Sequence, residues 1–273
     1  RCGYGNYDRG NGQIFLFDKP YLVDEDSTGS RTELFSEQMI YIPDSSLGIA
    51  RGSVVLIMSG RDSSEYRILC DSLIYHEDTG ELLAYGHTRL EADSVAATCG
   101  RAIYTKEPER LWLFDAPEVF DSHNRASGDS ILASLSNGEL ESANVFGDVK
   151  LLTHPGEDTL GLVPDSRFFS DRAIFYFEDS QLSHGALIGA VKTYYYPMVS
   201  DTSSFEFNQA FSDTVLFYSL DGKIDSVAFL LSAFGEYQRI ESGESDTIKY
   251  EGDSVFYSAS SDDIVLLGGA KLF

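Results

Sequence analysis

One short pattern recurs along the chain and limits its fold more than any other feature. Each copy starts at a glycine, and every second residue after it is apolar, β-branched or small. The copies are Gly52-x-Val54-x-Leu56, Gly86-x-Thr88-x-Leu90, Gly147-x-Val149-x-Leu151, Gly189-x-Val191-x-Thr193 and Gly268-x-Ala270-x-Leu272. Side chains two residues apart point to the same side of a strand, and the residues between them point to the other side. Each copy therefore predicts a strand with one dry face and one wet face.

Turn signals separate these strands. Asp78-Thr79-Gly80, Ser136-Asn137-Gly138 and Asp221-Gly222 each lie between two apolar runs, which is typical of β-hairpins. Apolar stripes with helical spacing are absent. A strand with one dry face must stack on its neighbours to bury that face, so we expect an all-β chain of roughly 20 to 24 strands folded as two facing sheets.

The repeated glycine has two interpretations. In the first, it marks a bulge or bend through which a curved sheet turns. In the second, its missing side chain leaves room for a ligand beside the apolar face. The two interpretations are compatible, and the first is the ordinary one.

Composition excludes several classes of function. The chain has 273 residues, of which 42% are hydrophobic and 13% aromatic, enough for a real core. Its net charge is −24 and its 20 lysines and arginines are scattered, so it lacks the clustered basic surface that binds nucleic acid. No apolar run approaches the ~20 residues that a membrane-spanning helix needs.

Motifs that carry chemistry are few. Gly128-Asp129-Ser130-Ile131-Leu132 and Gly252-Asp253-Ser254-Val255 imitate the start of a GDSL-type hydrolase, but both belong to the structural repeat and no helix is expected after them. The five histidines are dispersed and lack metal-ligand spacing. The acidic segments 24–26 and 260–263 are interpreted as solvated turns. We expect no enzymatic activity, no metal and no cofactor.

The three cysteines, Cys2, Cys70 and Cys99, form no C-x-x-C pair. The alternation of the strands places Cys70 and Cys99 on opposite faces. A disulfide between them would then need a bulge or a change of register. We expect two inert thiols within strands.

The repeating phrase resembles the OstA/LptA organic-solvent-tolerance family of lipopolysaccharide transport proteins, which includes the periplasmic part of the outer-membrane assembly protein. The resemblance is carried by residues 71–75 (Asp-Ser-Leu-Ile-Tyr), by residues 80–88 from Gly80 to Thr88, and by the parallel stretch 127–149. Residues 113–119 resemble the strand that precedes the motif in that family. The match is best over residues 66–152 and weaker over 12–60 and 165–273, so one continuous array over residues 1–273 is expected.

The resemblance implies an elongated, V-shaped β-jelly roll that is open along one side and located in the periplasm, in association with the outer membrane. Its dry interior would hold the acyl chains of lipopolysaccharide or a related lipid. Its open ends would join other OstA-like proteins, or further copies of the chain, by strand addition. The charge of −24 departs from this picture, because lipopolysaccharide head groups carry phosphates.

The residues expected to line the lipid groove share the parity of the repeat. They are Val54, Leu56, Leu73, Tyr75, Leu82, Ala84, Leu90, Ile131, Val145, Val149, Leu151, Val191, Val255, Tyr257, Leu266 and Leu272. Trp112 and Phe114 lie on a strand that is apolar on both sides, so their direction stays open. Two other functions stay open as well: a structural or adhesive β-solenoid with a filled core, and a carbohydrate-binding β-protein with exposed aromatic platforms.

Overall fold

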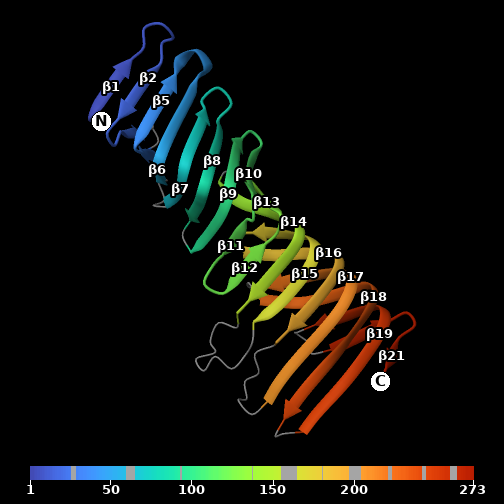
Figure 1. Ribbon diagram of the computed structural model, residues 1–273. Coiled ribbons are helices and arrows are strands. Elements are labelled where there is room, and N and C mark those ends of the chain that lie inside the picture. The colour runs from blue at the N-terminus through green and yellow to red at the C-terminus, as the bar shows by residue number, and fades with distance from the viewer. Residues whose placement is uncertain are drawn as a thin grey trace. The chain divides into compact units, whose positions relative to one another are not determined.

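The computed structural model describes residues 1–25, 29–59, 65–92, 94–136, 138–154, 165–179, 181–196, 204–220, 223–241, 244–258 and 263–273. Asn137, Asp221 and Gly222, which belong to predicted turns, lie outside these residues. The described residues form 21 strands and one 3-10 turn at Pro43–Ser45, and they contain no α-helix. The all-β prediction is confirmed (Figure 1).

The chain divides into two compact units. The first comprises Arg1–Ser122 with Ser134–Gly138, and the second comprises His123–Ala133 with Glu139–Phe273. Strands of the first unit are β1 (Tyr4–Tyr7), β2 (Ile14–Phe17), β3 (Tyr21–Glu25), β4 (Arg31–Phe35), β5 (Gln38–Ile42), β6 (Leu47–Ser59), β7 (Glu65–His76), β8 (Glu81–Ala92), β9 (Val95–Lys106), β10 (Glu109–Phe114) and β11 (Glu118–Phe120). The remaining strands are β12 (Asn124–Ser127), β13 (Ser130–Ser136), β14 (Glu139–Thr153), β15 (Ser166–Glu178), β16 (Gln181–Tyr195), β17 (Ser204–Leu220), β18 (Lys223–Glu241), β19 (Glu244–Ser258), β20 (Asp263–Leu267) and β21 (Lys271–Leu272).

Long antiparallel hairpins build each unit. β6 to β9 pair in chain order in the first unit, and β14 to β19 do so in the second. Pairing continues on both sides of a register shift in the middle of each pair. The described strands therefore pair into one hydrogen-bonded sheet and not into the two sheets expected, because each long strand contributes to both sides of the shift and remains hydrogen-bonded to the same neighbour.

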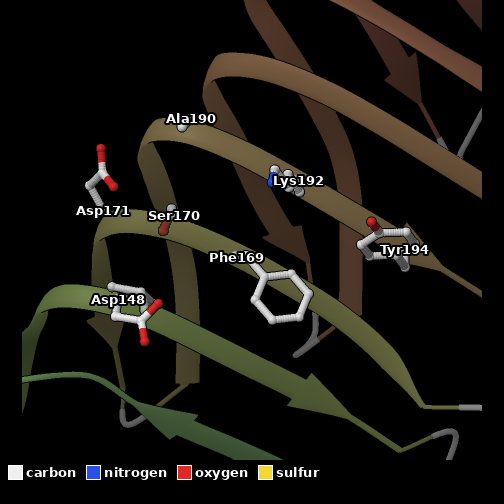
Figure 2. A pocket seen from close by; sticks show the side chains of 8 residues that line it. Asp148, Phe169, Ser170, Asp171, Ala190, Lys192 and Tyr194 are labelled. Atoms are coloured by element: carbon white, nitrogen blue, oxygen red, sulfur yellow. The ribbon is translucent and has the colours of Figure 1, made fainter.

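The register shift lies at a corner formed by two consecutive residues with positive φ. Gly86 and His87 have φ values of 74° and 45°, and Gly147 and Asp148 have values of 68° and 43°. Gly52, Gly189 and Gly268 begin corners of the same kind. Glycine adopts this left-handed conformation without a steric penalty, and Figure 2 shows the strands bending sharply beside Ala190, the second residue of one such corner. The bend interpretation of the repeated glycine is confirmed.

An acidic residue from a neighbouring segment occupies the space beside these glycines. A side chain at Gly86 would collide with the carboxylate of Asp71, and one at Gly147 would collide with that of Asp129. Asp171 and Asp253 stand in the same way against Gly189 and Gly268. The second interpretation of the glycine is wrong, because a carboxylate, and not a ligand, fills the room that the missing side chain leaves.

One face of each unit carries the buried side chains, and we call it the inner face. Cross-strand pairing aligns these residues in rows. In the first unit one row is Ala50, Leu73, Ala84, Ala102 and Leu113. In the second unit the corresponding row is Val145, Ala173, Leu187, Val215, Phe229, Val255 and Leu266. Almost every member of the two rows is buried, so this face provides the core of each unit.

Cys70 and Cys99 lie on the same face, and their predicted placement on opposite faces is wrong. Cys70 pairs with Val54 and Cys99 pairs with Thr88, and all four side chains are buried on the inner face. The strand turns its corner between Cys70 and Leu73, beside the register shifts to β6 and β8, and both side chains are buried on the inner face although three positions separate them. β8 lies between the two cysteines, which places them roughly 10 Å apart, too far for a disulfide. Both are free thiols.

These thiols make the stability of the first unit decrease as the pH rises in the alkaline range. Burial raises the pKa of Cys70 and of Cys99 to about 11. Unfolded thiols ionise at lower pH, near 9, so the unfolded chain loses protons first and stability falls as pH rises from about 9 to about 11. We expect a loss of roughly 1 kcal/mol per thiol per pH unit in this window. Urea unfolding from pH 8 to pH 11 measures it, with the Cys70→Ser/Cys99→Ser variant as control. Equal pH slopes for the two proteins would contradict the prediction.

Candidate functional site

Register places fifteen of the sixteen predicted groove residues on the inner face, and the sixteenth, Ile131, is buried. The buried members are Val54, Leu56, Leu73, Ala84, Ile131, Val145, Val149, Val191 and Val255. The half-buried members are Leu82, Leu90, Leu151, Tyr257 and Leu266, and the exposed ones are Tyr75 and Leu272. Trp112 and Phe114, whose direction the sequence left open, lie on the outer face, where their rings stack with centroids 5.5 Å apart.

Burial on the inner face decreases from the corner toward the strand ends. In β7, Cys70 and Leu73 flank the corner and are 5% and 3% exposed, whereas Tyr66 and Tyr75 farther along the strand are 41% and 43% exposed. In β16, Val191 next to the corner is buried, whereas Tyr195 is 40% exposed. Ile248 and Tyr250 in β19 differ in the same way. The apolar inner face is therefore covered beside the corner and accessible toward the strand ends.

Tyrosines dominate the accessible part of the inner face in the first unit. Tyr41, Tyr75 and Tyr104 belong to one cross-strand row, alternating with Gly48 and Leu82. The Tyr41 hydroxyl donates to Glu77 Oε2 at 3.1 Å, and the Tyr104 hydroxyl donates to Glu109 Oε1 at 3.1 Å. We call these strand-end positions of the inner face the rim. A ring with an apolar body and a polar tip suits a boundary between an oily interior and water.

The rim of the second unit has a similar composition. Tyr195 pairs with Asn208, and Asn208 pairs with Tyr237. The Asn208 side chain also accepts a hydrogen bond of 2.9 Å from the buried Tyr250 hydroxyl. Burial raises the pKa of Tyr195, with a smaller contribution from Glu206. The groove residues predicted from the sequence include Tyr75 and Tyr257 of the inner-face tyrosines. The others could have been found as tyrosines two or four residues from an apolar position of the same strand.

Basic side chains are concentrated on the opposite, outer face. Register and burial place there Arg31, Arg51, Arg67, Arg89, Arg101, Lys150, Arg167, Arg172, Lys192, Lys249 and Lys271. Among the strand residues whose side chains the structure describes, the inner-face cations are Lys106 and Arg239. Lys106 pairs across the strands with Glu109. Arg239 stands between two acids of its row: Glu206, whose Oε1 is 3.8 Å from Arg239 Nε, and Asp246 on the next strand. Each of these two rim cations therefore stands beside at least one acid.

The outer face of the second unit is hollowed beside the corners of β14, β15 and β16. This depression has a volume of about 420 Å³ and is lined by Asp148, Phe169, Asp171, Lys192 and Tyr194, among others (Figure 2). The Phe169 and Tyr194 rings meet edge to face with centroids 6.1 Å apart. A smaller depression of about 320 Å³ in the first unit lies beside Arg89 and Phe120. Both are open hollows that combine carboxylates with basic side chains.

The segments that imitate a hydrolase motif have structural positions. Asp129 packs at the corner against Gly147, and Asp253 packs against Gly268. Ser130 begins β13 and Ser254 lies within β19, so neither serine has the strand–elbow–helix setting of a nucleophile. Within the described residues, no group of three or more His, Cys, Asp or Glu side chains could hold a metal ion. The same part of the chain contains no helix that is long and apolar enough to cross a membrane.

Fold and site together define a stacked-strand β-protein with an apolar, partly accessible inner face. No family model and no curated protein sequence matches the chain. Among solved structures, the chain is similar to LptH, described as the LptA homologous periplasmic component of the conserved lipopolysaccharide transport device from Pseudomonas aeruginosa. The similarity covers 66% of this chain and 93% of that one, with 8% identity and a TM-score of 0.28, so it does not by itself assign a function.

Proposed function

We propose that the chain is an OstA/LptA-type lipid carrier that holds acyl chains of lipopolysaccharide or a related lipid along its inner face, in the periplasm, on the way to the outer membrane. The observation that carries the proposal is the gradient of burial on the apolar inner face of each unit. Each buried CH₂ of a lipid tail contributes about 0.8 kcal/mol. Accessible side chains such as Leu90, Leu151 and Leu266 would supply that burial without any catalytic group.

Both units contribute to the proposed site. Each has the same corner and the same rows of inner-face side chains, which supports treating residues 1–273 as one continuous array. The sixteen predicted residues are proposed as the lining of this site. The most deeply buried of them, such as Val54 and Val149, would form its floor. Half-buried and exposed members, such as Leu82 and Tyr75, would touch the lipid.

The proposed partners are other OstA-like chains, or further copies of this one, joined by strand addition. β1 at one end of the first unit pairs with β2, and β20 and β21 in the second unit pair with β19. These terminal strands expose Tyr4, Tyr7, Ile264, Val265, Leu267 and Leu272. A terminal strand with exposed apolar side chains is a template for pairing with another chain.

Photo-crosslinking at two consecutive tyrosines tests the carrier proposal. Tyr195 lies on the inner face and Tyr194 on the outer face of the same strand. With p-benzoylphenylalanine at either position, in a Gram-negative cell, we expect a lipid adduct of residue 195 and none of residue 194. Native mass spectrometry after membrane extraction should show lipid on the unmodified protein. Equal labelling at both positions, or a chain that carries no lipid, would favour a purely structural array instead.

A further inference from the structure

We propose that the rim selects lipids whose head group is uncharged and rich in hydroxyl groups, and that it disfavours phosphorylated head groups. The inference rests on the proposed carrier function and specifies the lipid class that the same site would take. Three features of the rim support it. Most basic side chains lie on the outer face, the carboxylates of the rim can only accept hydrogen bonds, and those carboxylates already have partners in the protein.

The partition of charge works against an anionic head group. A lipid tail on the inner face would place its head at the strand ends, beside the Glu109 and Lys106 pair in the first unit and beside Glu206 and Asp246 in the second. Most basic side chains that could attract a phosphate lie on the other side of the sheet. Arg239 is the inner-face cation of its row and is flanked by two acids. With a net charge of −24, the chain would repel a phosphate at long range as well.

The hydrogen-bonding groups of the rim favour a lipid head group that donates hydrogen bonds. Carboxylates only accept hydrogen bonds, whereas a phenol hydroxyl donates one and accepts others. Tyr75 and Tyr195 place such hydroxyls on accessible ring systems, and Asn208 adds an amide. A sugar supplies many hydroxyl donors together with apolar C–H faces that can lie against a tyrosine ring. A phosphate supplies only acceptors and charge.

The rim carboxylates already have hydrogen-bond or ion-pair partners, which argues against a cationic head group. Glu77 accepts from the Tyr41 hydroxyl, and Glu109 accepts from the Tyr104 hydroxyl and from the Gly138 amide at 3.1 Å. Glu206 is paired with Arg239. An added cation would compete with these partners, whereas a hydroxyl can donate to a carboxylate lone pair that remains. The neutral, hydroxylated head group is therefore the best match.

Three dodecyl probes that differ only in their head group test the inference: dodecyl maltoside, dodecyl phosphate and dodecyltrimethylammonium. Calorimetric titration of the full chain below each critical micelle concentration, at 50 and 300 mM salt, gives the affinities. We expect the maltoside to bind at least tenfold more tightly than the phosphate at low salt, and more tightly than the ammonium probe. Added salt should reduce the difference in affinity between the maltoside and the phosphate, because salt screens the repulsion of the phosphate.

A pair of double variants assigns the effect to the rim. Glu206→Gln/Asp246→Asn neutralises the two acids that flank Arg239 in its row. It should raise the affinity for dodecyl phosphate by about tenfold and leave the affinity for the maltoside unchanged. Glu236→Gln/Glu251→Gln removes two outer-face acids from β18 and β19 and should change neither affinity. Tightest binding of the phosphate or the ammonium probe would overturn the inference and leave the carrier standing. Failure of every probe to bind would overturn the carrier, and the inference with it.

Discussion

Replacing Val149 with aspartate is expected to lower the free energy of unfolding of the second unit by about 3–5 kcal/mol, because it buries a charge that no neighbour can pair. Val149 is 1% exposed on the inner face, opposite Ser170. Ser170 already donates its hydroxyl to the carbonyl of Arg172 at 3.0 Å. The aspartate would find an apolar interior around it and would either be protonated or open the corner to water. Thermal and urea unfolding measure the loss.

Lys150→Asp is the matched control for this variant. Lys150 is the next residue in β14, and its side chain points outward and forms an exposed ion pair of 3.0 Å with Asp148. Such a pair contributes at most about 1 kcal/mol, so this variant should melt near the wild type. Lipid capture should be lost in Val149→Asp and retained in Lys150→Asp. A Val149→Asp protein that melts and captures lipid like the wild type would contradict both the fold assignment and the carrier proposal.

Gly147→Ala is expected to cost about 2–3 kcal/mol, through two separable effects. Gly147 has a φ of 68°, which costs an L-residue about 1–2 kcal/mol. The new methyl group would also collide with the Asp129 carboxylate that fills the corner. Equilibrium unfolding measures the sum. Because corners of this kind recur along the chain, a similar loss is expected at Gly86 and Gly189.

Two further variants separate the collision from the backbone strain. Gly138 also has positive φ, 83°, but nothing lies within 4 Å of a side chain placed there, so Gly138→Ala should cost only about 1 kcal/mol. Adding Asp129→Ala to Gly147→Ala should recover the part of the loss that comes from the collision. If Gly138→Ala lowers the free energy of unfolding as much as Gly147→Ala does, the collision with the Asp129 carboxylate contributes nothing to the loss of stability.

Alternation of residue types predicted the strands and the separation of the two faces. Val54, Val145, Val191 and Val255 are all buried on one side of their strands, and that follows from a period of two alone. The repeated glycine also predicted the bend. These features depend on local backbone geometry, so the sequence contains them in full.

Alternation did not predict the direction of side chains on either side of a corner. Cys70 and Leu73 share a face because β7 turns its corner between them, where its register with both neighbouring strands shifts. Leu231 and Ser232 form a corner in β18 with φ values of 64° and 60°, although no glycine marks it in the sequence. A bulky residue in that conformation is strained, and only the pairing of β18 with its two neighbours holds it there.

The sequence by itself determined that the chain is β-structured, where its strands alternate, and that one side of them is apolar. The tertiary structure alone decided which tyrosines reach the rim, where Trp112 and Phe114 point, and how charge divides between the faces. The reason is physical: the direction of a side chain along one strand follows from the chain's own geometry, whereas its depth below the surface and its charged neighbours depend on strands that pair with it from other parts of the sequence.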